Sequence, residues 1–224
     1  MADHMQDEAD LEAIKRWWDE NGKSLVAAII VAVLGTVGWQ QYQGYQGSQE
    51  QAASDLYATM LAIQLEEGDA AQLAAAGATL KSEHSGSTYA QFAAMLEARI
   101  AVEADDLERA EASLRWALSV GDPHSDIGQL IQLRLARVMA ARGSEEEALA
   151  ILERGGDAYP VAYAQAEGDI HLAAGRAEKA LLAYRAGRDT STELGEVSVV
   201  LDNKVRGLET RMPIDEAERK GEQG

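Results

Sequence analysis

Apolar residues recur at helical spacing along most of the chain, and short polar breaks separate the segments that show this pattern. One clear example is the run of Leu130, Leu133, Ala136 and Met139, which follow one another at intervals of three residues. No segment alternates apolar and polar residues over a useful length, so we predict an all-α fold. The breaks contain Gly, Asp or Pro and lie at 67–69, 85–87, 104–106, 121–123, 142–144, 155–157 and 174–176.

The breaks also group the predicted helices into repeating pairs. Three times, a small residue is followed twelve positions later by alanine and four positions after that by a large apolar residue. In each set the turn between the helices comes seven residues after the first member, at Asp105, Gly143 and Gly175. Glycine suits such a turn because the chain often needs a positive φ at a helix C-terminus. The three sets are Ala98, Ala110 and Leu114; Ala136, Ala148 and Leu152; and Gly168, Ala180 and Tyr184.

The spacing of these sets indicates a known kind of repeat. They begin 38 and 32 residues apart, which brackets the 34-residue period of the tetratricopeptide repeat. We therefore predict a tetratricopeptide-repeat-like α-solenoid over residues 46–211, with a divergent first pair at 47–66 and 70–83 and a capping helix near 193–211. The repeat is degenerate, because the first-helix tryptophan and tyrosine are missing, so a generic helical bundle is the alternative. Residues 212–224 are predicted to form a flexible tail.

The longest apolar stretch, residues 25–39, has fifteen positions without a charge and lies within an uncharged run that ends at Gln49. A helix over this stretch is about 22 Å long, but extension through Tyr45 gives roughly 31 Å, enough for a hydrocarbon layer of about 30 Å. We predict an uncleaved transmembrane helix over residues 24–45, with a buried core helix and a cleaved signal peptide as the alternatives. The residues predicted to lie at the membrane interface are Lys15, Arg16, Trp17, Trp18, Lys23, Trp39 and Tyr42.

The basic residues near this span give its predicted orientation. Lys15, Arg16 and Lys23 precede the span, and no lysine or arginine follows it until Lys81. Because cytoplasmic flanks carry the excess of basic residues, we expect residues 1–23 to be a cytoplasmic leader. The domain after the span then lies across the membrane, which in a Gram-negative cell is the periplasm.

Composition argues against several classes of function. Acidic residues outnumber basic residues 38 to 20, and a chain with a formal charge of −18 repels phosphate, so we expect no nucleic acid partner. The chain has no cysteine, no Gly-x-Ser-x-Gly motif, and no histidine with a second ligand at metal-binding spacing. We therefore expect no enzyme activity, no metal and no cofactor. An envelope hydrolase would require His84, His124 and His171 to converge in space.

A solenoid of this kind offers one face, formed by the first helix of each pair, for binding another protein. Apolar side chains mixed with arginine suit the capture of a helix or an extended segment. Several of the leucines are expected to pack against neighbouring repeats instead. The predicted face presents Phe92, Met95, Arg99, Leu130, Leu133, Arg137, Ala141, Gln165, Asp169 and Leu172.

With these parts placed, the sequence resembles the YfgM family of ancillary SecYEG translocon subunits. The likeness is densest directly before the span, and it covers most of residues 9–210. The stretches that carry it are 12–23, Gly38 and Trp39, 87–90 and 133–138.

The resemblance implies a non-catalytic inner-membrane protein whose repeat domain lies in the periplasm. It also implies two protein partners, the SecYEG translocon and a PpiD-like chaperone, which is a membrane-anchored periplasmic protein of the parvulin type. Together, such proteins pass translocated chains to periplasmic folding factors. An anchored helical-repeat adaptor for cytochrome maturation or outer-membrane assembly would share the same sequence features and is the alternative.

Overall fold

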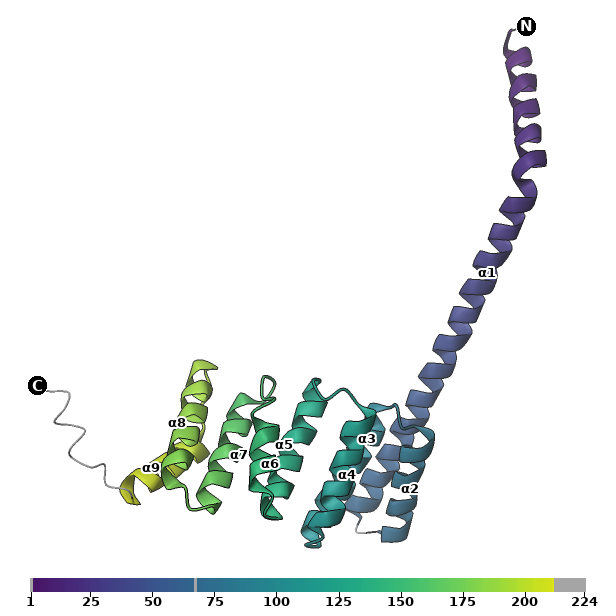
Figure 1. The fold of residues 1–224 in the computed structure, drawn as a ribbon. Coiled ribbons are helices and arrows are strands. Elements are labelled where there is room, and N and C mark those ends of the chain that lie inside the picture. The colour runs from purple at the N-terminus through teal and green to yellow at the C-terminus, as the bar shows by residue number, and fades with distance from the viewer. Residues whose placement is uncertain (1, 67, 212–224) are drawn as a thin grey trace, which may run out of the picture. The chain divides into compact units, whose positions relative to one another are not determined.

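The structure is a computed structural model that describes residues 2–66 and 68–211, with side chains from residue 15 onward. Every regular element in these residues is an α-helix, which confirms the predicted all-α class (Figure 1). The predicted tail at 212–224 lies outside the described residues. The helices are α1 (Ala2–Leu65), α2 (Ala70–Glu83), α3 (Thr88–Glu103), α4 (Leu107–Val120), α5 (Asp126–Ala141), α6 (Glu145–Leu152), α7 (Pro160–Ala173), α8 (Ala177–Glu193) and α9 (Val199–Arg211).

The chain divides into two compact units, Met1–Ala52 and Ala53–Gly224. The first unit consists of most of α1, and its apolar stretch is exposed, with Val31 and Leu34 showing 69% and 66% of their surface. By length and composition this helix is the one candidate membrane span in the described residues. Exposed apolar surface on this scale marks a site of contact with a membrane or a partner, whereas a core helix would be buried.

The flanks of the apolar stretch are exposed as well. The four flanking aromatic residues predicted at the membrane interface each expose more than half of their surface, and Lys15, Arg16 and Lys23 are also exposed. The helix expected at 47–66 is not separate, because α1 continues to Leu65 without a break. No proline interrupts it, and a glycine inside a helix costs only about 1 kcal/mol. The four aromatic residues are Trp17, Trp18, Trp39 and Tyr42.

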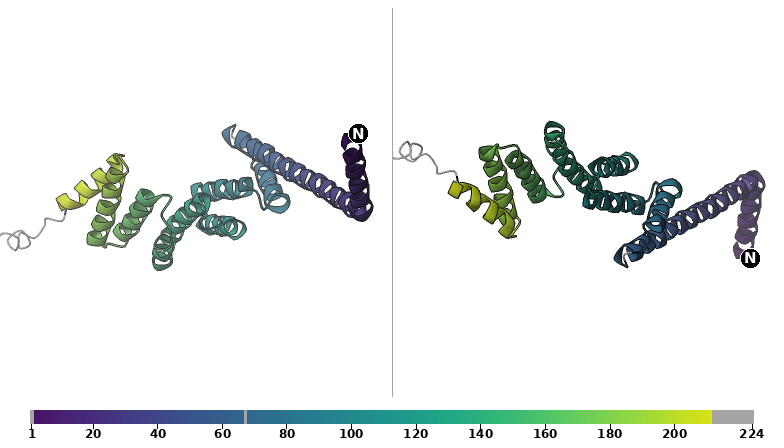
Figure 2. Two further views of the ribbon diagram at one scale, coloured as in Figure 1. Left: turned by 90° about the horizontal axis from the view of Figure 1, so that it is seen from above. Right: turned by 90° about the horizontal axis from the view of Figure 1, so that it is seen from below.

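The second unit is a series of antiparallel helix pairs, with α3 beside α4, α5 beside α6, and α7 beside α8 (Figure 1, Figure 2). The predicted breaks lie between helices, the first of them in its described residues Gly68 and Asp69. The three predicted turn residues have positive φ: +58° at Asp105, +91° at Gly143 and +75° at Gly175. The last helix begins at Val199 rather than near 193, because the chain leaves α8 through Gly195, whose φ is +76°.

The third set of the repeat shows why a small residue is needed in the first helix of a pair. A Cβ atom built on Gly168 would lie 2.4 Å from the ring of Tyr184 on the paired helix. Glycine is therefore the residue that fits there, and the large partner fills the space that it leaves. All nine residues of the repeat pattern are buried, namely Ala98, Ala110, Leu114, Ala136, Ala148, Leu152, Gly168, Ala180 and Tyr184.

Three buried clusters connect these pairs. The largest joins α3 to α7 and includes Ile131, Leu135 and Met139. A second lies between the C-terminal end of α1, α2 and α3, and a third joins α8 to α9. The helices that form each cluster follow one another in the chain, as expected for a stack in which every repeat contacts its neighbours.

Buried polar groups connect neighbouring pairs. The Gln129 side-chain carbonyl accepts hydrogen bonds from the backbone N–H groups of Gly156 (3.2 Å) and Ala158 (3.0 Å), and its backbone carbonyl accepts one from the Tyr163 hydroxyl (2.7 Å). On the other side, Lys81 of α2 donates to Glu97 of α3 at 2.6 Å. No buried side-chain nitrogen or oxygen of the described residues lacks a partner. The polar links therefore fix the spacing between pairs without leaving an unsatisfied group.

His171 occupies a buried position on α7. Its Nδ1 atom accepts a hydrogen bond from Arg176 Nε at 3.0 Å. Burial, followed by the nearby Arg176 charge, lowers the pKa of the imidazole below its ordinary value of 6.5. The folded protein therefore favours the neutral ring.

We predict that replacing Gly168 by alanine destabilises the second unit by about 1–3 kcal/mol, because the new methyl group overlaps the Tyr184 ring. Gly207 is the matched control, since it lies inside α9 with no atom within 4 Å of a built Cβ. Gly207→Ala should be neutral or stabilising by up to about 1 kcal/mol through helix propensity. Urea denaturation of the detergent-solubilised chain, followed by circular dichroism, measures both. Equal effects from the two substitutions would contradict the packing described here.

We also predict that His171 makes the domain less stable in mild acid. The folded pKa lies below the unfolded value of 6.5, so the stabilisation is present above that pH and is lost as the pH falls below it. The thermal midpoint of wild type should fall more between about pH 7.5 and about pH 5.5 than that of His171→Gln, which cannot titrate. His124→Gln, at an exposed position, is the control and should keep the wild-type pH dependence. Identical profiles for wild type and His171→Gln would exclude this role.

Candidate protein-binding groove

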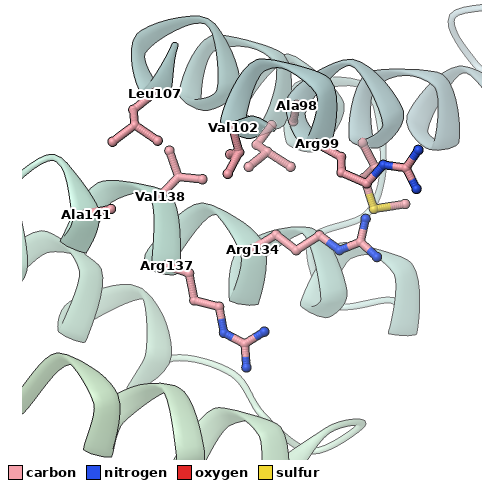
Figure 3. Close-up of a pocket in the computed structure, with 10 residues that line it drawn as sticks. Ala98, Arg99, Val102, Leu107, Arg134, Arg137, Val138 and Ala141 are labelled. Atoms are coloured by element: carbon pink, nitrogen blue, oxygen red, sulfur yellow. The ribbon is translucent and has the colours of Figure 1, made fainter. Parts of the chain in front are cut away.

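A cavity of about 300 Å³ opens between α3, α4 and α5. Its walls are mostly apolar, and Figure 3 shows Val102, Leu107 and Val138 directed into the space between the helices. Arg99 and Arg134 lie together at one end of this space. The lining residues are Met95, Ala98, Arg99, Val102, Leu107, Leu114, Arg134, Arg137, Val138 and Ala141.

A second cavity of about 380 Å³ lies between α3, α5 and the C-terminal end of α1. It shares Met95, Arg99 and Arg134 with the first cavity, so the two cavities are adjacent. We call the two together the arginine groove. The second cavity adds Tyr57, Leu61, Phe92, Leu96 and Leu130 to its lining.

Helical spacing on two neighbouring first helices builds the groove. On α3, Met95, Arg99 and Val102 are separated by four and then three residues and therefore share one face. On α5, Arg134, Val138 and Ala141 repeat the same intervals. The sequence thus presents a stripe with one arginine and two apolar residues, at the same intervals, on each side of the groove.

Aromatic rings support the end of the groove nearest α1. The ring centroid of Tyr57 lies 5.8 Å from that of Phe92 and 6.0 Å from that of Tyr89. Tyr89 and Phe92 meet edge to face at 6.3 Å. Aromatic pairs of this geometry are stabilising beyond the area they bury, so these contacts stabilise this wall of the groove.

The charge of the groove contrasts with that of the chain. Arg99 makes only an exposed ion pair, with Glu103 at 3.5 Å, and within the described residues Arg134 and Arg137 have no ion pair or side-chain hydrogen bond. Between Asp126 and Arg142, these two arginines are the only charged residues in the sequence. A protein with a net charge of −18 therefore keeps an unneutralised positive site in this groove.

Comparison with known proteins gives the family of the chain. Residues 15–210 match the family described as "Tetratricopeptide repeat-like domain". A Haemophilus influenzae protein named "Ancillary SecYEG translocon subunit" is 30% identical over 87% of the chain and 94% of its own length. This chain belongs to the YfgM family.

Two further members carry the same name. The Aggregatibacter actinomycetemcomitans protein is 31% identical over 91% of the chain and its own full length. The Escherichia coli protein is 28% identical over 84% of the chain and 90% of its own length. No solved structure matches the chain. The family match thus confirms the predicted tetratricopeptide-repeat-like class, and it covers both the apolar helix and the repeats.

Most of the residues predicted to bind a partner line the groove of this YfgM-family member. They are Phe92, Met95, Arg99, Leu130, Arg137 and Ala141. Leu133 does not, since it is only 2% exposed and packs in the main core. The prediction omitted Arg134, although its position four residues after Leu130 puts it on the same helical face. It also omitted Val102 and Val138, which continue the two stripes.

The predicted residues on α7 lie outside the groove. Asp169 instead connects three helices, because it accepts a hydrogen bond from the Tyr184 hydroxyl of α8 and pairs with Lys204 of α9, both at 2.6 Å. Burial and this hydrogen bond raise the pKa of Tyr184, so the hydroxyl stays protonated and donates. Gln165 and Leu172 line neither cavity of the groove. Asp169 therefore has a structural role in the last pair.

The histidines do not form a metal site in the described part of the chain, where no group of three or more potential ligands comes together. His171 is engaged by Arg176 inside α7 and its following turn. What the groove can do chemically is bind: its apolar walls take up apolar side chains, and its guanidinium groups donate hydrogen bonds to carboxylates.

We predict that Asp169→Ala destabilises the second unit by about 1–3 kcal/mol, because it leaves the buried Tyr184 hydroxyl without its acceptor and Lys204 without its partner. Asp169→Asn keeps an acceptor oxygen and should lose less. Urea denaturation of the solubilised chain measures both variants. If Asp169→Ala is as stable as wild type, Asp169 does not stabilise the last pair, and a role in binding becomes possible again.

Proposed function

We propose that this protein is a non-catalytic ancillary subunit of the SecYEG translocon, held in the bacterial inner membrane by a single helix near residues 24–45. Residues 1–23 lie in the cytoplasm, and the repeat domain lies in the periplasm. There the domain pairs with a PpiD-like membrane-anchored chaperone and helps to pass translocated chains to periplasmic folding factors.

The family relationship carries this proposal. The relatives named as SecYEG translocon subunits match the chain along 82–91% of its length, so the similarity is not confined to one module. A subunit of a membrane channel needs a membrane anchor, and the exposed apolar part of α1 is a candidate for it. The basic residues Lys15, Arg16 and Lys23 on one side of the apolar stretch support a cytoplasmic leader.

The repeat domain supports binding rather than catalysis as the task of the second unit. Stacked helix pairs form extended surfaces suited to other proteins. The arginine groove provides such a surface within this unit, with apolar walls and free guanidinium groups. A chaperone partner would use this kind of surface to hold the two proteins together.

Photocrosslinking combined with purification tests the proposal. A photoreactive residue in place of Val33 should crosslink to a translocon channel subunit, because Val33 is exposed in the apolar stretch. Tagged full-length protein from membranes solubilised in a mild detergent should also bring down a PpiD-like chaperone. The same photoreactive residue in place of the exposed Leu182 is the control and should not reach the channel.

Absence of both partners from the purified complex would refute the proposal. Recovery of cytochrome-maturation or outer-membrane-assembly proteins instead would favour an adaptor for those tasks. Recovery of the translocon without a chaperone would support the association with SecYEG and refute the pairing with a PpiD-like chaperone.

A further inference from the structure

We infer that the arginine groove binds a polypeptide segment of a partner that carries acidic side chains along an apolar face. The apolar side chains fill the space between α3 and α5, and the carboxylates reach Arg99 and Arg134. This inference rests on the proposed function and deepens it, because it names the chemistry by which a protein partner is recognised.

The size of the groove fits a segment rather than a single side chain. Each of its cavities, at about 300 Å³ and about 380 Å³, is large enough for a ligand site, since such sites start at about 300 Å³. Along α3 the lining runs from Phe92 to Val102, which corresponds to about 15 Å of helix. A bound helix of about ten residues would cover that length and place three turns against the wall.

The arginines determine the charge of the ligand. Arg134 and Arg137 have no acidic partner in the described residues, and the one pair made by Arg99 is exposed to solvent. A guanidinium group binds a carboxylate through two parallel hydrogen bonds, which a lysine cannot do. Figure 3 shows Arg99 and Arg134 close together at one end of the space between the helices, where one acidic stripe could meet both.

The net charge of the chain strengthens the selectivity of the groove for an acidic segment. With a net charge of −18, the chain repels an acidic segment from most of its surface and attracts it only where positive charge is unneutralised. A basic segment would be attracted to the surface elsewhere and repelled at the groove. A second copy of this chain is a poor occupant for the same reason, since the two copies repel each other.

Peptide binding to the full-length chain in a nonionic detergent tests the inference. The probe is a fluorescein-labelled amphipathic peptide of about 16 residues, with leucine on one face and glutamate beside it, long enough for four helical turns. The matched peptide has glutamine at every glutamate position. Fluorescence anisotropy should show that the glutamate peptide binds at least about tenfold more tightly, with empty micelles as the blank.

Two double variants separate the groove from overall charge. Arg99→Gln with Arg134→Gln should weaken binding of the glutamate peptide by about 10- to 100-fold and reduce its salt dependence. The control is Arg154→Gln with Arg206→Gln, which removes the same charge at exposed positions outside the groove. The control should bind the peptide nearly as well as wild type. Thermal melts should show that both double variants fold.

A substitution in the apolar wall tests the groove without removing an arginine. Val102 is 44% exposed at the groove, so Val102→Asp should be tolerated by the fold and should place a carboxylate beside the arginines. It should weaken binding of the glutamate peptide by at least about tenfold, because the new carboxylate partly neutralises the arginines of the groove. Val199→Asp, exposed on α9 and outside the groove, should leave the affinity unchanged.

Several results would overturn the inference. These are equal binding of the glutamate and glutamine peptides, wild-type affinity in the Arg99 and Arg134 double variant, or an equal loss in the control. A gain in affinity when residues 212–224 are removed would also overturn it, since the chain's own acidic tail would then be the occupant. If the glutamate peptide fails to bind while crosslinks from Val33 still reach the channel, the inference falls and the proposed function stands.

Discussion

The close approach of two helices at a small residue is the constraint on which the repeat domain depends. At Gly168 the first helix of a pair presents no side chain, and Tyr184 of the second helix fills the space. The corresponding residues of the other two sets, Ala98 with Leu114 and Ala136 with Leu152, are buried in one cluster. The turn between them needs a positive φ, which Asp105, Gly143 and Gly175 adopt. With each pair fixed in this way, α3 and α5 lie side by side at a spacing that leaves the arginine groove open between them.

Much of the fold follows from the sequence because its determinants are local. The helix breaks and the turn residues both depend on residue type within one repeat. The groove was predicted in part for the same reason, since Phe92, Arg99 and Arg137 follow from helical spacing.

Contacts across repeats were not predicted. Asp169 pairs with Lys204, which is 35 residues away and on another helix, and no spacing rule connects the two. The prediction also missed that α1 continues through Gly44 and Gly47, because a single glycine lowers helix stability only weakly and does not end a helix.

The charge distribution connects the groove with the membrane helix. Three basic residues precede the apolar stretch and three arginines line the groove, in a chain in which acidic residues outnumber basic residues 38 to 20. The first group is the basis of the cytoplasmic leader that we propose. The second group, with Arg134 and Arg137 unpaired in the described residues, is the basis of the acidic partner segment that we infer.

The proposed function requires the repeat domain and its groove to lie on the opposite side of the membrane from the leader. The chain has no cysteine, so single cysteines report position without background. Ala112→Cys, at an exposed position on α4, should react with a membrane-impermeant maleimide in intact spheroplasts, and Ala9→Cys in the leader should react only after lysis. Reaction of Ala9→Cys in intact spheroplasts, with Ala112→Cys protected until lysis, would contradict the account.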